Sequence, residues 1–316
     1  MTRTVVAAAY GGPEVLAVQD IALPAPGPGQ VVVDVRAAGT NPIDYKLYSG
    51  DMGNDPAALP LQVGQEVAGV VSAVGSGEIL GYTGPLRVGD EVIATNIGSG
   101  GYADQVLADA AEVGHKPAAL SFEESAGLLL VGGTAWHLLT KTKVGTGDTV
   151  LIHGASGGVG LMAIQLAVAR GATVIATASP SRHDTLRQYG AEPVAYGPGL
   201  ADRVRAIARP EAGIDAALDL AGTDEALDVS VELVVDKSRI ATIANFDRAF
   251  ALGIAVLTAA DDGQEIRDAS RPELIKLAQA GTLTVTVDKV FPLADAAAAH
   301  RYLLMGHAHG KVVLVP

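Results

Sequence analysis

The stretch that decides the fold is LIHGASGGVGLMAIQLA, residues 151–167, because it joins an apolar run to a helical pattern through a glycine-rich turn. Two unrelated motifs fit this turn. Residues 154–158 satisfy the G-x-S-x-G elbow of a hydrolase, in which Ser156 would be a nucleophile. The same turn, with Ala155 in place of the first glycine, fits a nucleotide-binding G-x-G-x-x-G motif, in which Ser156 would lie beside a phosphate.

Composition narrows the classes of protein. The chain has 316 residues, of which 49% are apolar and 18% charged, so it can bury the core of an ordinary globular protein and is long enough for two domains. Its formal net charge of -13 leaves no basic surface for a nucleic-acid backbone, and no apolar tract reaches the roughly 20 residues that span a bilayer. The absence of cysteine excludes disulfides and thiolate metal sites. We expect a cytoplasmic protein that binds neither nucleic acid nor membrane.

Two kinds of pattern divide the chain. Up to about Leu120, short β-branched runs alternate with Gly and Pro and helical spacing is scarce, which predicts a strongly twisted β domain. From residue 122 strands and helices alternate, and the strands are continuous apolar runs typical of a parallel sheet covered on both faces. The predicted strands of this second domain are residues 149–153, 173–178, 193–196, 215–221, 239–244 and 253–259. After about residue 270, helices and strands that can return to the first domain follow.

This order of patterns separates the two motifs. A hydrolase elbow needs an acid and then a histidine downstream, and Asp219 and His300 occur in that order. It also needs βαβ units before the elbow, whereas this chain has some 120 residues of β-rich sequence there. A nucleotide turn needs a strand before it and a helix after it, and both are present. No Gly-Lys-Ser/Thr follows, so the turn is not a P-loop. The sequence favours a dinucleotide site.

The end of the next predicted strand indicates which dinucleotide binds. NAD-specific proteins usually place an acidic residue there for the ribose hydroxyls, and that charge would repel a 2′-phosphate. This chain has Ser179, Ser181 and Arg182 at that place, which together form a candidate phosphate pocket and predict NADPH as the cofactor. An ordinary Ser-Pro turn that caps the next helix is the alternative, and the two roles can coexist.

The ordered landmarks of the whole chain resemble the zinc-independent quinone oxidoreductase branch of the medium-chain dehydrogenase/reductase superfamily. The landmarks are GTNPIDYKLYSG, GQEVAGVVSAVG, VGDEV, GGYADQVLA, GGTAW, HGASGGVG and GKVVL. The resemblance implies an α/β protein with an N-terminal, twisted, β-barrel-like (GroES-like) catalytic domain, residues 1–121 and 270–316, and a Rossmann domain with a doubly wound parallel sheet, residues 122–269. It also implies a homodimer, and the apolar predicted strand 253–259 would lie at the sheet edge, where an uncovered strand is a liability unless it pairs.

The resemblance also predicts that no metal is bound. Where the zinc-dependent relatives carry their three catalytic ligands, this chain has Asn41, Gln65 and a residue near Leu130, none of which is a zinc ligand. Without a Lewis acid, catalysis depends on placing the nicotinamide hydride beside an acceptor that is already polarised. Quinones and activated alkenes meet that requirement better than simple alcohols.

The resemblance assigns residues to the site. Asn41 lies near the nicotinamide, and Tyr45 and Tyr48 are the candidates for the substrate oxygen, with partly buried core aromatics as the alternative. The predicted cofactor-binding residues are Thr134, Ala155, Ser156, Gly157, Gly158, Val159, Ser179, Ser181, Arg182, Tyr196, Ala221, Ala244 and Asn245. Lys46 replaces a tyrosine frequent in the quinone reductases and admits enoyl or alkenal reduction.

The predicted function is therefore an NADPH-dependent reductase of quinones or α,β-unsaturated carbonyls. Two alternatives stay open at this point: a specific enoyl or 2-alkenal reductase, and a low-turnover, redox-responsive NADPH-binding protein.

Overall fold

The computed structural model describes residues 1–98, 100–208, 213–258, 262–306 and 308–316. The chain divides into two compact units, Met1–Leu130 with Leu274–Pro316, and Val131–Glu273. The first division falls after residue 130, in helix α3 (Leu129–Lys141), and the second after residue 273, in helix α9 (Gly263–Gln279). The expected boundaries were 121/122 and 269/270, so each division lies somewhat later in the chain.

The first unit is built on sheets whose strand pairs are mainly antiparallel. Its strands are β1 (Thr2–Ala7), β2 (Leu16–Ile21), β3 (Gln30–Gly39), β4 (Leu61–Gln62), β5 (Glu66–Val74), β6 (Leu80–Gly81), β7 (Gly84–Pro85), β8 (Glu91–Thr95), β9 (Gln105–Asp109), β10 (Val113–His115), β17 (Val287–Pro292) and β18 (Lys311–Val315). The largest sheet has the order β10-β8-β5-β3-β18-β17, with β9 also on β3. The C-terminal strand β18 thus pairs antiparallel with β3, more than 270 residues earlier in the chain, which confirms the predicted return of the tail.

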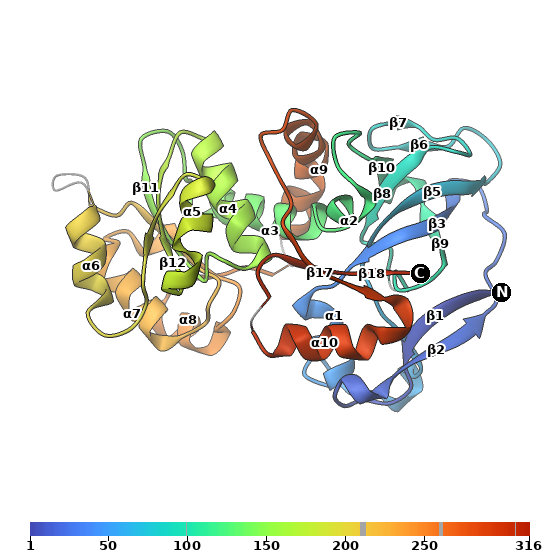
Figure 1. The fold of residues 1–316 in the computed structure, drawn as a ribbon, viewed down its shortest axis with the longest axis horizontal. Helices are drawn as coiled ribbons and strands as arrows, with labels where there is room; N and C mark the ends of the chain where they lie inside the picture. Colours follow the sequence, from blue (N-terminus) through green and yellow to red (C-terminus); the bar gives the residue numbers. More distant parts are fainter. Residues whose placement is uncertain (99, 209–212, 259–261, 307) are drawn as a thin grey trace. The chain divides into compact units, whose positions relative to one another are not determined.

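Three helices accompany these strands: α1 (Pro42–Ser49), α2 (Phe122–Ser125) and α10 (Ala296–Leu304). Figure 1 shows α10, in red, beside the blue α1, although the two are far apart in the sequence. The sequence analysis does not predict α1. Its signals are nevertheless present, because Pro42 occupies the first turn, the Asp44 carboxylate accepts the Asn41 N–H at 2.8 Å, and Gly50 ends the helix with φ 94°.

The second unit is a doubly wound domain with a parallel sheet, as predicted. Its strands are β11 (Thr149–His153), β12 (Thr173–Thr177), β13 (Ala191–Val194), β14 (Ala216–Asp219), β15 (Ile240–Thr242) and β16 (Ala255–Val256). They pair in parallel in the order β13-β12-β11-β14-β15-β16. Every residue of β11 and β14 is buried, as expected of central strands covered on both faces.

Helices connect these parallel strands. They are α4 (Gly158–Ala169), α5 (His183–Gln188), α6 (Leu200–Ile207), α7 (Asp224–Leu233) and α8 (Phe246–Leu252), of which the sequence analysis does not predict α8. In Figure 1 the yellow-green α4 and α5 lie apart from the yellow-to-orange α6, α7 and α8. In the described part of the chain, no helix is both long and apolar enough to cross a membrane.

Candidate cofactor and substrate sites

The glycine-rich turn between β11 and α4 has two glycines with different structural roles. A Cβ built on Gly160 would lie 2.5 Å from Ala155 O, so this position must be glycine for helix α4 to approach the turn. A Cβ built on Gly157 would meet nothing closer than Gly154 O at 3.7 Å, and the φ of Gly157, -79°, suits any residue. The fold therefore requires glycine at 160, whereas the open space over Gly157 is available to a ligand.

The first turn of α4 points its amides at that space. The first backbone bond into the helix runs from Leu161 N to Gly157 O at 2.9 Å, so the amides of residues 158–160 have no acceptor within the helix. These amides and the helix dipole make the amino end of α4 a site for an anion. Ser156 and Val159 are half-buried at its edge.

The segment after β12 supplies a cationic group, Arg182. Arg182 is half-buried, and its Nε is a buried atom with no hydrogen-bond partner in the described part of the protein. The Ser179 and Ser181 hydroxyls lie 3.1 Å apart just before it. Tyr196, after β13, is 62% exposed. A guanidinium whose Nε has no partner, close in sequence to two hydroxyls, can bind a phosphate through that N–H without breaking an existing bond.

Asp219 organises the loops after β14 and β15, a role that the sequence analysis missed. Its buried Oδ1 accepts the N–H groups of Ala221 at 3.0 Å and Gly222 at 2.9 Å. Its Oδ2 accepts the hydroxyl of Thr242 at 2.7 Å, and the Thr242 oxygen in turn accepts the Ala244 N–H at 3.0 Å. A buried acid at the carboxyl end of a strand, followed by Ala and Gly, was the available signal.

Asn245 joins the two loops. Its Nδ2 donates to Gly222 O at 3.0 Å, and its Oδ1 accepts the Arg248 N–H at 3.2 Å and so caps α8. The predicted cofactor residues of this unit, apart from Thr134, follow the carboxyl ends of the parallel strands, which is the usual ligand-binding edge of such a sheet. Thr134 lies on α3, where it is buried.

In the first unit, Asn41 takes part in a buried ionic cluster. Lys311 Nζ lies 2.6 Å from Asn41 Oδ1 and 2.7 Å from Glu66 Oε1, and it also donates to Thr40 O at 3.0 Å. Asn41 Nδ2 donates to Glu66 Oε1 at 3.0 Å. Glu66 Oε2 accepts the Leu130 N–H at 3.0 Å, so both carboxylate oxygens are used. All three charged and amide side chains are buried.

A second buried polar network starts at Asp44. The Tyr102 hydroxyl donates to Asp44 Oδ2 at 2.8 Å and lies 3.1 Å from His300 Nε2, and the Tyr48 hydroxyl lies 2.7 Å from His300 Nδ1. Because the Tyr102 hydroxyl gives its proton to Asp44 Oδ2, His300 Nε2 donates to Tyr102 and Nδ1 accepts from Tyr48. Burial raises the pKa of Asp44 to about 7 and lowers the pKa of His300 to about 4.

These networks redefine two of the expected roles. Tyr48 is 1% exposed with its hydroxyl on His300, whereas Tyr45 is half-buried and retains accessible surface. Both lie on α1. The hydrolase alternative also loses its partners, since both nitrogens of His300 and both oxygens of Asp219 are engaged elsewhere.

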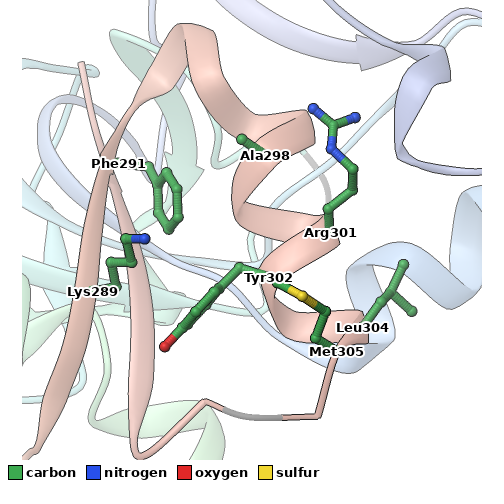
Figure 2. A pocket seen from close by; sticks show the side chains of 7 residues that line it. All are labelled: Lys289, Phe291, Ala298, Arg301, Tyr302, Leu304 and Met305. Atoms are coloured by element: carbon green, nitrogen blue, oxygen red, sulfur yellow. The ribbon is translucent and has the colours of Figure 1, made fainter.

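A surface hollow of about 580 Å³ lies between β17 and α10 of the first unit (Figure 2). Lys289 Nζ lies 4.8 Å from the ring centroids of both Phe291 and Tyr302. In Figure 2 the side chains of Arg301 and Leu304 point away from Phe291, so polar groups do not converge on this hollow. It contains none of the predicted site residues.

Comparisons with known proteins identify the family. Residues 27–168 match the model of the alcohol dehydrogenase GroES-like domain, and residues 189–314 match a zinc-binding dehydrogenase model. A quinone oxidoreductase of Pseudomonas aeruginosa is 34% identical over 100% of both chains. The chain belongs to the quinone oxidoreductase family of the medium-chain dehydrogenase/reductase superfamily. It is an oxidoreductase of the fold that the sequence predicts.

Solved structures agree with this family. A structure described as an NAD-dependent alcohol dehydrogenase has a TM-score of 0.87 and 32% identity, with 99% of each chain covered. The Escherichia coli quinone oxidoreductase complexed with NADPH has a TM-score of 0.85 and 29% identity, with 100% of each chain covered.

The description of the second family model raises the question of zinc. At the positions to which the resemblance assigns the ligands of the zinc-dependent relatives, Asn41 and Gln65 offer amides and the residue near Leu130 is apolar, and none of these is a zinc ligand. The ammonium of Lys311 lies 2.6 Å from Asn41 Oδ1, which places a positive charge where a cation would need an electron donor. The residues at this place do not fit a zinc ion.

Proposed function

We propose that the chain is an NADPH-dependent reductase of quinones or α,β-unsaturated carbonyls that works by direct hydride transfer without zinc. The observation that carries the proposal is the glycine-rich turn at the amino end of α4, which leaves space over Gly157, together with Arg182 one strand away, whose Nε has no partner in the described residues. The names of the relatives support the same cofactor and acceptor.

The chain's own residues would hold the cofactor at several points. The amides of residues 158–160 and the Ser156 hydroxyl would bind the pyrophosphate. Ser179, Ser181 and Arg182 would bind the 2′-phosphate, with Tyr196 on the adenine side. The loops that Asp219 organises would hold the nicotinamide ribose and ring through Ala221, Ala244 and Asn245. When bound, the cofactor supplies the hydride.

Arg182→Ala should weaken NADPH binding by about 1.5 to 3 kcal/mol, the range for a charge-assisted hydrogen bond, and leave NADH binding unchanged. The reason is that only NADPH carries the 2′-phosphate. Fluorescence titration of both nucleotides measures the effect. Arg187→Ala is the matched control, because Arg187 is on the same segment but pairs with Asp184 at 2.9 Å on the surface. Equal affinity of the wild type for NADH and NADPH would contradict the assignment of Arg182.

The acceptor side of the proposal rests on α1. Tyr45 is the tyrosine with accessible surface, and we assign it to the substrate oxygen in preference to Tyr48. A quinone or enone is polarised before it binds, so a hydrogen-bond donor or water suffices at its oxygen where zinc would be needed for an alcohol. Lys46, next to Tyr45, stands where the quinone reductases often have tyrosine, and for this reason the proposal includes enones as acceptors.

A panel of acceptors tests the function. Wild-type protein with NADPH or NADH is mixed with 1,4-benzoquinone, larger quinones, 2-alkenals and enones, and nucleotide oxidation is followed at each. We expect turnover with NADPH on at least one class, unchanged by a chelator or by added zinc. Tight NADPH binding without turnover on any acceptor would support the alternative of an NADPH-binding protein, and a loss of turnover with the chelator would contradict zinc independence.

We also propose a cytoplasmic homodimer. Strand β16 is the last strand of the parallel sheet in the described residues and pairs there with β15, which leaves its other edge for a second copy of the chain. Light scattering at micromolar concentration should give the mass of a dimer, and a monomeric mass would contradict the proposal.

A further inference from the structure

The buried cluster of Lys311, Glu66 and Asn41 has no assigned role. Lys311 is 3% exposed and Glu66 1% exposed, so neither charge is solvated. The three donors of the ammonium have three acceptors, Thr40 O, Asn41 Oδ1 and Glu66 Oε1. A buried pair of opposite charges is weak evidence for stability, because desolvation offsets the attraction, so its presence calls for another explanation.

The cluster fixes the orientation of the Asn41 amide. Lys311 can only donate, so the amide oxygen must face it, and the carboxylate of Glu66 can only accept, so the amide nitrogen must face that group. A flipped amide would place N–H groups against the ammonium and the oxygen against the carboxylate. The remaining Nδ2 hydrogen donates to Gly39 O over a longer distance, 3.4 Å, so both ends of this buried amide are held within the first unit.

The backbone holds the ammonium in place. Thr40 N donates to Val312 O at 3.0 Å, and the Thr40 hydroxyl donates to the same oxygen at 2.8 Å. Strand β18 therefore fixes Lys311 directly beside the residue that begins α1. The closing segment of the chain brings this charge to Asn41, 270 residues away in the sequence.

We propose that Lys311 and Glu66 are positioning residues, which hold the Asn41 amide and with it the start of α1, the helix that carries Tyr45 to the oxygen of the bound acceptor. This inference rests on the proposed function, in which Tyr45 on α1 meets the substrate oxygen. Lys311 and Glu66 touch neither substrate nor cofactor and act through Asn41. Lys311, which begins β18, thus determines how fast the acceptor receives hydride.

The main variant is the double substitution E66Q/K311M. It removes both charges together, since K311M alone would leave a buried carboxylate without a counter-charge. We expect the folded double variant to bind NADPH as the wild type does, while kcat/KM for the acceptor falls at least tenfold. The control is Lys289→Met, which removes an exposed lysine of the same unit outside the cluster and should leave both quantities unchanged.

An isotope effect separates positioning from loss of folded enzyme. With NADPH deuterated at the transferred position, the isotope effect on kcat should rise in E66Q/K311M, because hydride transfer becomes slower than the other steps. A smaller fraction of active protein would lower kcat without changing this ratio. An unchanged kcat/KM, or a lower kcat with an unchanged isotope effect, would overturn the proposal.

A second measurement does not depend on turnover. The side-chain amide signal of Asn41, assigned by its loss in Asn41→Leu, should exchange its hydrogens slowly in the wild type and at least tenfold faster in E66Q/K311M. Equal exchange rates would overturn the positioning role even if no acceptor were reduced. Absence of turnover in the wild type, by contrast, would overturn the proposed function. The exchange measurement would then decide the positioning role alone.

Epistasis shows whether Lys311 acts through Asn41. In the Asn41→Leu background, E66Q/K311M should reduce kcat/KM by less than twofold further, and a full additional loss would contradict the proposal. If the double variant fails to fold, Lys311→Arg takes its place. Its planar guanidinium cannot bring one nitrogen to all three oxygens, so the same loss in kcat/KM and the same faster exchange are expected.

Discussion

Gly157→Ala should melt at the temperature of the wild type and bind NADPH about 10- to 100-fold more weakly, the equivalent of about 1.4 to 2.8 kcal/mol. The added methyl group meets no protein atom closer than 3.7 Å, so the folded chain accepts it without rearrangement. It does occupy the space through which a pyrophosphate would approach the amides of α4. Thermal melting and a fluorescence titration with NADPH measure the two quantities.

Gly160→Ala is the matched control, with the opposite expectation. Its methyl group would lie 2.5 Å from Ala155 O, a backbone atom that cannot move without shifting the turn or the helix. This variant should lose about 1 to 3 kcal/mol of stability, as overpacked cores do. If Gly157→Ala lowered the melting temperature as much as Gly160→Ala while NADPH binding stayed intact, the turn would be structural and the cofactor assignment would fail.

The parallel-sheet domain was predictable because its signals are local. Strands such as β11 and β14 are buried on both faces and are therefore continuous apolar runs in the sequence. Helix α1 was missed for the opposite reason. Its eight residues, PIDYKLYS, mix polar and apolar side chains without a clear apolar face, and it is marked by its end residues Asn41, Pro42, Asp44 and Gly50.

The site was predictable in part. The turn residues 155–159 and the group around Arg182 follow from their positions at strand ends. The roles of Lys311 and His300 do not, because both reach α1 from segments more than 250 residues away, and no sequence periodicity reports such contacts. The sequence indicates Asp219 only as a possible member of a hydrolase triad, because a single acid at a strand end does not reveal which backbone N–H groups donate hydrogen bonds to it.

The Asp44–His300 network should show two opposing dependences of stability on pH. The folded pKa of His300 is about 4 against an ordinary 6.5, so the unfolded chain takes up a proton first, and this contribution to stability is lost as the pH falls from 6.5 to 4. The folded pKa of Asp44 is about 7 against an ordinary 3.8, so its contribution is full below 3.8 and is lost as the pH rises to 7. Between about pH 4 and 6.5 the two largely cancel.

Single substitutions should expose each dependence. In His300→Gln, the Gln oxygen can accept from Tyr48 and its NH₂ can donate to Tyr102, so the network keeps its hydrogen bonds while losing the titration. The free energy of unfolding of this variant should rise relative to the wild type by up to about 3 kcal/mol as the pH falls from 6.5 to 4. Asp44→Asn should show the opposite change, gaining relative to the wild type as the pH rises from 4 to 7. Urea unfolding at several pH values measures both.

Tyr48→Phe is the control for this pair of results. It removes the hydroxyl from His300 Nδ1 but leaves both titrating groups in place, so it should lower stability by about 0.5 to 1.5 kcal/mol with little change in its pH dependence. Parallel curves for the wild type and His300→Gln across pH 4 to 6.5 would mean that His300 is not held neutral by burial. His300 donates from Nε2 to Tyr102, which leaves the Tyr102 proton for Asp44 Oδ2, the same atom that accepts the backbone N–H of Asn41 at the start of α1.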